Sequence, residues 1–133
     1  MILVDSSIWI DFFRGTLSAQ TDRLAAGLDA GEACTGDLIV AEVLQGFRDE
    51  NEFQTAWRLM NGVPIIAISS RTVAYDAAGN YRFLRARGIT VRKTIDTLIA
   101  TRCILDGIPL LYSDRDFDPF VEHLGLQSAL ALS

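Results

Sequence analysis

Short apolar segments alternate with helical segments along the chain, and this alternation limits the possible folds more than any other feature of the sequence. The apolar runs have the length of buried strands, whereas the segments between them have the length and periodicity of helices. The predicted strands cover residues 1–5, 32–35, 63–69 and 108–113, with 126–130 as a candidate fifth, edge strand. The predicted helices cover residues 6–15, 18–31, 36–47, 50–62, 69–88 and 93–107. Such alternation is typical of an α/β fold around a mostly parallel sheet.

Capping signals indicate where the helices begin and end. Ser6 or Ser7 is expected to cap the first helix, and Thr94 the last long one. Segment 36–47 contains the run "LIV", which by itself fits a strand, but its length and Asp37 as an N-cap favour a helix. The expected helix stops are glycines, namely Gly15, Gly31, Gly62, Gly88 and Gly107.

The composition fits one compact domain. The chain has 133 residues, half of them hydrophobic, with no internal repeat or linker, so residues 1–133 are treated as a single domain. No apolar run is long enough to span a membrane, and the first residues lack the basic and apolar parts of a secretory signal. Cys34 and Cys103 lie far apart, without a metal-binding spacing. A reduced protein of the cytoplasm is the simplest expectation.

Five carboxylates stand out from their surroundings. Asp5 ends the first predicted strand and Asp114 follows the last strong one. In open α/β sheets, ligand sites usually lie beyond the carboxyl ends of the strands, so these two positions are candidates for a site. Glu42 is an isolated carboxylate in a mainly apolar helix, and Asp96 lies in the first turn of another helix. Asp116 follows Asp114 by two positions.

Each of these acids also has a purely structural explanation. Asp5 could cap the helix that follows it, and Glu42 could lie on a polar helix face. Asp96 could complement the positive end of its helix dipole. Asp114 could cap a turn, with Asp116 as a solvated turn residue. Taken one by one, the structural explanation is about as good as a functional one for Asp5 and Asp96, and it is the better one for Glu42.

The combined pattern favours a divalent cation. Carboxylates gathered at one end of a sheet repel one another unless a cation lies between them, and hard cations such as Mg²⁺ or Mn²⁺ prefer oxygen ligands. Two such ions, about 3.5–4 Å apart, would activate a water molecule and stabilise the leaving oxygen of a phosphodiester. Zinc is disfavoured, because His123 is the only histidine and is expected to be a helix-end residue.

The net charge of −5 argues at first sight against a nucleic-acid partner. Two divalent ions would change it to about −1 and would place the added charge where a phosphate binds. A local basic patch could contact the nucleic-acid backbone, and the alternative is an ordinary exposed helix face. The patch consists of Arg82, Arg85, Arg87, Arg92 and Lys93.

Four segments resemble the PIN-domain ribonucleases, and in particular the VapC-type toxins of bacterial type II toxin–antitoxin pairs. They are "ILVDSSIWIDFFRG" at the start, "AEVLQGF" around Glu42, "TIDTLIA" around Asp96 and "LLYSDRDFDPF" around Asp114. The first and last are fairly specific, and their order and spacing extend the resemblance over essentially the whole chain.

The resemblance implies a PIN-like α/β/α sandwich and a metal-dependent endoribonuclease, commonly a homodimer, that a cognate VapB-type antitoxin neutralises. The family's acidic quartet falls on Asp5, Glu42, Asp96 and Asp114, with Asp116 as an additional acid and Ser7 as a small polar residue near the metal. Asp5 and Asp96 are expected to be the main ligands of Mg²⁺ or Mn²⁺. Glu42 and Asp114 are expected to complete the metal shell or to orient water, and Asp116 to support them. The expected products carry 5′-phosphate and 3′-hydroxyl ends.

Aromatic residues raise the question of a protein partner. Trp9, Phe12 and Phe13 share a helical face, which favours core packing. In VapC-like proteins, grooves near such helices accept an antitoxin segment, so these residues and Trp57 have two interpretations.

Two rival functions are considered. In a haloacid-dehalogenase-like phosphatase, Asp5 would be the nucleophile, but the position of the second aspartate is occupied by Ser7, and Lys93 is the only lysine. A non-catalytic module of PIN fold would bind RNA or a protein through an inactive metal site, and the intact acids argue against it.

Overall fold

The computed structural model describes residues 1–130, and its centre is a four-stranded sheet in the order β3-β2-β1-β4. The strands are β1 (Ile2–Val4), β2 (Ala33–Gly36), β3 (Ile65–Ile66) and β4 (Leu110–Leu111). All three strand pairs are parallel, and Leu3 of the central strand is in register with both Cys34 and Leu110. Because the strands are parallel, their carboxyl ends lie along one edge of the sheet, which is the edge where the site was expected.

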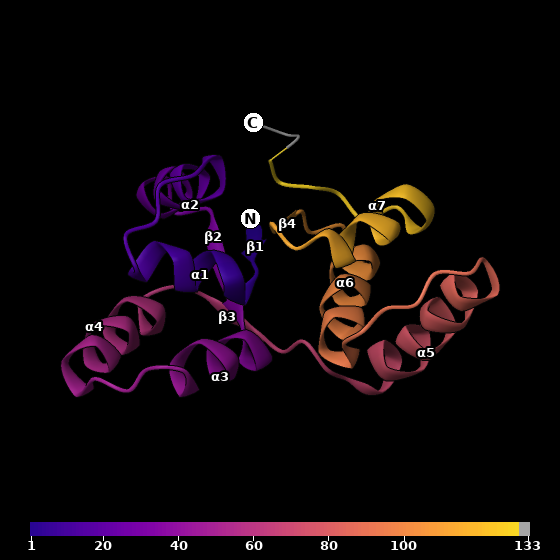
Figure 1. Ribbon diagram of the computed structural model, residues 1–133, viewed down its shortest axis with the longest axis horizontal. Helices are drawn as coiled ribbons and strands as arrows, with labels where there is room; N and C mark the ends of the chain where they lie inside the picture. Colours follow the sequence, from indigo (N-terminus) through magenta and orange to yellow (C-terminus); the bar gives the residue numbers. More distant parts are fainter. Residues whose placement is uncertain (131–133) are drawn as a thin grey trace.

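In the described part of the chain, seven α-helices and one short 3₁₀-helix surround the sheet. They are α1 (Ser6–Phe13), α2 (Ala19–Asp29), α3 (Asp37–Gln45), α4 (Glu50–Asn61), α5 (Arg71–Ala86), α6 (Thr94–Asp106), η1 (Arg115–Phe117) and α7 (Asp118–Leu124). In Figure 1, α1, α2 and α4 lie towards the left, α3 lies below the strands, and α5–α7 lie on the right. The predicted α/β sandwich with a parallel sheet is confirmed.

Three of the predicted strands are shorter than expected, most of all β3 and β4, and one predicted strand is absent. β3 and β4 have two residues each, because the apolar runs continue past the last backbone pairing. The predicted strand over 126–130 is wrong. Only one isolated parallel bridge forms there, between Leu110 and Ser128, supported by the hydrogen bond from the Leu110 amide to the Gln127 carbonyl.

The predicted N-caps were wrong at three helices. The N-cap positions of α1, α3 and α6 are Asp5, Gly36 and Lys93, each one or two residues before the predicted residue, and none makes a side-chain capping hydrogen bond. At α1 and α3 the strand runs directly into the helix, so no separate cap residue is available. Asp37 instead accepts hydrogen bonds from the amides of Leu38 and Ile68, which joins the start of α3 to the chain after β3.

The core encloses the central strand on both sides. Leu3 and Val4 are completely buried, and so is Trp9, whose indole Nε1 donates to the Val4 carbonyl at 3.1 Å. Core packing is therefore the correct interpretation of Trp9, while Phe12 and Phe13 are half-buried against the core. Gly107, with φ of +64°, ends α6 and turns the chain into β4. Among residues 1–130, no helix has the length and apolar character needed to cross a membrane.

Candidate metal centre

The sheet topology brings two of the predicted acids to neighbouring strand ends. Asp5 directly follows β1, and Asp114 comes shortly after β4, the strand that pairs with β1 in parallel. The Asp5 amide donates to the Leu111 carbonyl at 3.0 Å, so backbone pairing holds the end of β1 beside the end of β4. Asp96 enters from the first turn of α6. Residues that are far apart in the sequence thus approach one another at a single edge of the sheet.

Three carboxylates form a group compact enough to hold a cation. Asp96, Asp114 and Asp116 each offer an oxygen atom, and these three atoms lie within 4.8 Å of one another. Asp5 and Glu42 are outside this group, but both repel the charge of Asp96 and thereby raise its pKa. Each of the other four predicted acids therefore either shares the compact group with Asp96 or repels its charge.

Asp96 is an acid whose ionisation is disfavoured in the folded protein. Its side chain is buried, and burial is the largest cause that raises its pKa to about 7. Repulsion from Asp5, Asp114 and Glu42 acts in the same direction, and Lys93 opposes it. A neighbouring cation would reverse this effect, because it would favour the ionised carboxylate.

Asp5 is buried at the N-cap position of α1, but it does not cap the helix. Its Oδ2 accepts a hydrogen bond of 3.0 Å from Ser7 Oγ. Burial raises the pKa of Asp5, the bond from Ser7 lowers it, and repulsion from Glu42 raises it further. The capping explanation of Asp5 is therefore wrong, and so is the idea that Ser7 is a helix cap.

Glu42 is oriented by Ser6, a residue that was predicted only as a helix cap. Ser6 Oγ donates to Glu42 Oε1 at 3.3 Å, across the contact between α1 and α3. Glu42 is half-buried, whereas Gln45 and Asp49, the polar residues that would share a polar helix face with it, are exposed. The local signal for Ser6 was its position in "DSS" beside Asp5, which places two hydroxyl donors at the end of β1.

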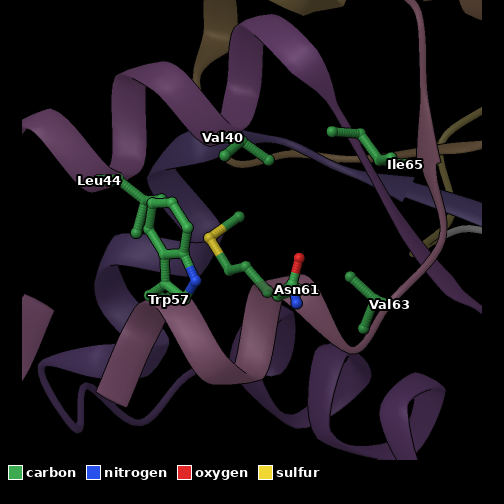
Figure 2. A pocket seen from close by; sticks show the side chains of 7 residues that line it. Val40, Leu44, Trp57, Asn61, Val63 and Ile65 are labelled. Atoms are coloured by element: carbon green, nitrogen blue, oxygen red, sulfur yellow. The ribbon is translucent and has the colours of Figure 1, made fainter. Parts of the chain in front are cut away.

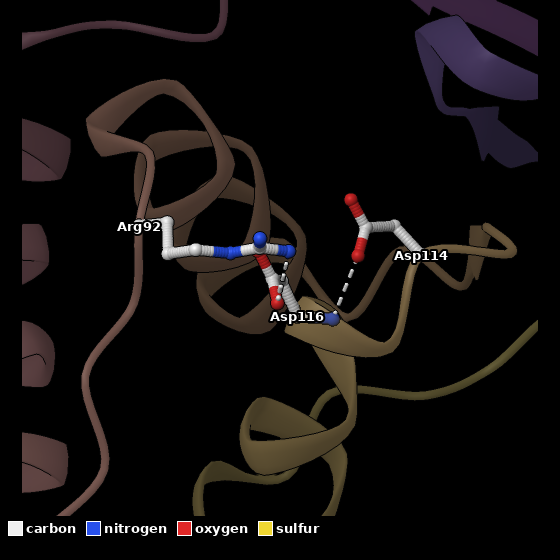
Figure 3. A network of polar contacts seen from close by, with 3 residues as sticks. All are labelled: Arg92, Asp114 and Asp116. Atoms are coloured by element: carbon white, nitrogen blue, oxygen red, sulfur yellow. Dashed lines mark hydrogen bonds and ion pairs between the residues drawn. The ribbon is translucent and has the colours of Figure 1, made fainter.

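Asp114 and Asp116 are linked to each other and to a basic residue. Asp114 Oδ1 accepts from the Asp116 amide at 2.9 Å, so Asp114 does cap η1 as the structural explanation proposed. Both carboxylate oxygens of Asp116 accept from Arg92, at 3.0 and 3.2 Å, and Figure 3 shows the three side chains in one network. Asp118 is outside this network and accepts a hydrogen bond from the Tyr112 hydroxyl at 3.1 Å.

The residues of the predicted basic patch are all exposed, but they do not form one uniform surface. Arg85 lies over the ring of Tyr81 and Arg87 over the ring of Phe83, so both contact aromatic residues of α5. Arg92 contacts the acidic group directly, through Asp116.

Two further residues named in the sequence analysis, Trp57 and His123, lie in α4 and α7. Trp57 is half-exposed and lines an apolar pocket of about 120 Å³ between α3 and α4, which Figure 2 shows. The other residues of the pocket are Val40, Leu44, Met60, Asn61, Val63 and Ile65. His123 lies in the last turn of α7, as expected for a helix-end residue.

Comparison with known proteins agrees with this arrangement. The PIN domain family matches residues 2–121. Ribonuclease VapC11 of Mycobacterium tuberculosis and VapC ribonuclease Mb1587 of Mycobacterium bovis are each 36% identical to the chain over 131 residues, covering 97% of this chain and 98% of the relative. The chain belongs to the VapC family of PIN-domain ribonucleases. The fold of this VapC-family chain also matches the crystal structure of VapBC2 from Rickettsia felis bound to a DNA fragment from their promoter, with a TM-score of 0.73 and 17% identity over 96% of this chain and 97% of that one.

The acids of this VapC-family chain fit a hard divalent cation. The donor set consists of carboxylate oxygens, which suits Mg²⁺ or Mn²⁺. Within residues 1–130, Asp5 Oδ1 and Asp96 Oδ2 are buried and have no hydrogen-bond partner. Buried carboxylate oxygens without a partner are costly, and ligation of a cation is one way in which a protein satisfies them.

Proposed function

We propose that this VapC-family chain is an RNA-cleaving toxin whose activity depends on Mg²⁺ or Mn²⁺ held at the acidic centre. The main support for metal dependence is that, in the described part of the chain, Asp5 and Asp96 each have a buried carboxylate oxygen without a hydrogen-bond partner. Repulsion among the acids, which raises the pKa of Asp96 to about 7, supports the same proposal. The names of the relatives, which are ribonucleases, support RNA as the substrate.

We assign distinct tasks to the acids. Asp5 and Asp96 would be the principal ligands, and Asp114 and Glu42 would complete the site. When bound, the metal supplies a Lewis acid that lowers the pKa of water and neutralises charge on the phosphodiester. Ser7 holds Asp5 by its hydrogen bond to Oδ2, which leaves Oδ1 free for a ligand.

Ser6 has the corresponding task at Glu42. Its hydrogen bond to Oε1 orients the carboxylate and leaves Oε2 available to accept a proton or to position water. The expected products carry 5′-phosphate and 3′-hydroxyl ends.

The proposal also includes a protein partner, the antitoxin, and a homodimeric assembly. The matching VapBC2 structure supports an antitoxin partner for this chain. We propose that a cognate VapB-type antitoxin neutralises the chain, that the chain forms a homodimer, and that it acts in the cytoplasm, where its RNA substrates are found. The pocket beside Trp57 is a candidate for contact with the antitoxin, because its apolar side chains are partly exposed.

The phosphatase alternative has little support. Ser7 stands where that class needs a second aspartate, and it donates to Asp5 Oδ2 instead of supplying an acid. A covalent phospho-aspartate trapped on Asp5 would favour this alternative over hydrolysis by activated water.

The decisive experiment compares the wild-type protein with Asp5→Asn on structured RNA. Each protein is treated with chelator and then supplied with Mg²⁺ or Mn²⁺, and the new RNA 5′ ends are mapped. Wild type should cleave only when metal is added, and Asp5→Asn should lose cleavage while keeping its circular-dichroism spectrum. Asp118→Asn is the matched control, because Asp118 bonds to Tyr112 and not to the acidic group. RNA binding by wild type without metal-dependent cleavage would favour a non-catalytic module.

A further inference from the structure

Arg92 differs from the other basic residues because it is attached to the acidic group. It lies between α5 and α6, and it approaches Asp116 side-on, with Nε donating to Oδ2 at 3.0 Å and Nη2 donating to Oδ1 at 3.2 Å. The side chain of Arg92 is 74% exposed, whereas that of Asp116 is 19% exposed. Asp116 is therefore the more buried partner of the pair, and Arg92 is the partner that faces solvent.

This ion pair contributes little to stability. Solvent screens the charges of a pair that has an exposed partner, so such a pair adds little to the free energy of unfolding. The two parallel hydrogen bonds nevertheless fix the plane and the direction of the guanidinium. Asp116 is fixed in turn, since its amide donates to Asp114 (Figure 3). Orientation of the guanidinium is thus the main effect of the contact.

The oriented guanidinium keeps free donors beside the acidic group. A guanidinium has five N–H groups, and two of them are used on Asp116. The remaining three, including both on Nη1, have no acceptor among residues 1–130. Phosphate oxygens are suitable acceptors for such a planar fork. An RNA phosphate could therefore be bound here next to the group formed by Asp96, Asp114 and Asp116.

The same contact makes Asp116 a poorer metal ligand than its neighbours. Both of its oxygens already accept a hydrogen bond from a cation, and a metal ion would have to share them with that positive charge. Asp5 and Asp96, in contrast, have buried oxygens without a partner in the described chain.

We propose that Arg92 binds an RNA phosphate beside the acidic centre, and that Asp116 is a positioning residue that orients Arg92 instead of holding the metal. This inference rests on the proposed function, since it assumes an RNA substrate. The inference also separates Arg92 from other residues of the basic patch. Arg85 and Arg87 lie over aromatic rings of α5 and do not contact Asp116.

The test measures RNA binding and metal binding separately. Binding of a fluorescein-labelled RNA hairpin is followed by anisotropy in Ca²⁺ at several salt concentrations, and intact RNA is verified on a gel afterwards. Arg92→Ala should weaken binding about tenfold, as expected for one charge-assisted hydrogen-bonded contact. It should also reduce the slope of log Kd against log salt by about one. Arg92→Lys should restore only part of the affinity, because an ammonium cannot form the fork.

Asp116→Asn should weaken RNA binding in the same direction, and the double variant should be no weaker than Arg92→Ala alone. Mn²⁺ affinity, measured by electron paramagnetic resonance without RNA, should stay within about twofold of wild type in Asp116→Asn and fall strongly in Asp96→Asn. Arg85→Ala is the matched control on the basic patch and should leave the salt slope unchanged.

Two results would overturn the inference. One is an equal loss of RNA affinity in Arg85→Ala and Arg92→Ala, which would indicate a general electrostatic surface. The other is a loss of Mn²⁺ affinity in Asp116→Asn as large as that in Asp96→Asn, which would make Asp116 a metal ligand. Absence of metal-dependent cleavage by wild type is a separate result, which would refute the proposed function itself.

Discussion

Ser6 donates a hydrogen bond to Glu42, which lies 36 positions further along the chain, at a distance of 3.3 Å. The next residue, Ser7, donates in the same way to Asp5. Two adjacent hydroxyl groups at the first turn of α1 therefore orient two acids from different elements, Asp5 at the end of β1 and Glu42 within α3. The segment that follows β1 thus holds two of the acids in place by side-chain hydrogen bonds.

Ser6→Ala should lower the cleavage rate without unfolding the protein. Loss of one hydrogen bond of about 1 kcal/mol corresponds to a decrease in kcat of about fivefold, because Glu42 would no longer be held in one orientation. The free energy of unfolding should change by less than about 1 kcal/mol, since Ser6 is only half-buried. Steady-state cleavage and urea denaturation measure the two effects. Ser69→Ala, at an exposed position, serves as the control, and an equal loss of kcat in both variants would contradict the assignment.

The stability of the metal-free protein should decrease as pH rises from about 4 to about 7. Asp96 has its pKa raised from 3.8 to about 7, so the folded protein retains a proton over this range that the unfolded chain has released. The stabilisation is complete below the lower value and is lost as the pH passes the upper one. Mg²⁺ or Mn²⁺ should restore stability most strongly above pH 7, where Asp96 is ionised.

The measurement is thermal unfolding in chelator from pH 4 to pH 8, for wild type and Asp96→Asn. The variant should show a smaller decrease, and at pH 8 it should melt above wild type by roughly 3–5 °C for each kcal/mol of repulsion removed. A wild-type protein whose melting temperature falls no more than that of Asp96→Asn would show that Asp96 ionises normally.

Two glycine substitutions should have opposite effects on stability. A Cβ added at Gly36 would lie 2.5 Å from two side-chain atoms of the buried Ile68, so Gly36→Ala should cost about 1–3 kcal/mol. A Cβ at Gly79 meets no described atom within 4 Å, and Gly79 lies inside α5, so Gly79→Ala should stabilise the protein by about 0.5–1 kcal/mol. Chemical denaturation of both variants tests the pair. Destabilisation by Gly79→Ala would contradict the expectation that a methyl group at position 79 meets no steric obstacle.

The two tryptophans should differ in their contribution to folding. Trp9 is completely buried and donates to the Val4 carbonyl, so Trp9→Ala should cost about 3–5 kcal/mol. Trp57 is half-exposed, and Trp57→Ala should cost less than about 1 kcal/mol. Because Trp9→Ala could prevent folding altogether, Trp9→Phe is the second variant, with an expected cost of about 1–3 kcal/mol for the orphaned carbonyl and lost volume. Equal stability of all three variants would place Trp9 outside the core.

The positions of two acids of the site could be predicted from the sequence. Asp5 and Asp114 were selected because each follows a short apolar run, and parallel strands necessarily bring such positions to one edge of a sheet. The boundaries were harder to predict. Caps expected at Ser6 or Ser7, Asp37 and Thr94 were displaced, since residue preferences at helix ends do not show where a strand passes directly into a helix.

The sequence by itself determined the α/β architecture, the positions of the strand-end acids and the apolar character of the first strand, because these depend on hydrophobic periodicity and on residues close together in the chain. Only the tertiary structure decided that Ser6 faces Glu42, that Arg92 pairs with Asp116, and that Asp96 is buried among other acids. These contacts join residues from separate elements, and their energies depend on distance and burial in three dimensions, which no local pattern records.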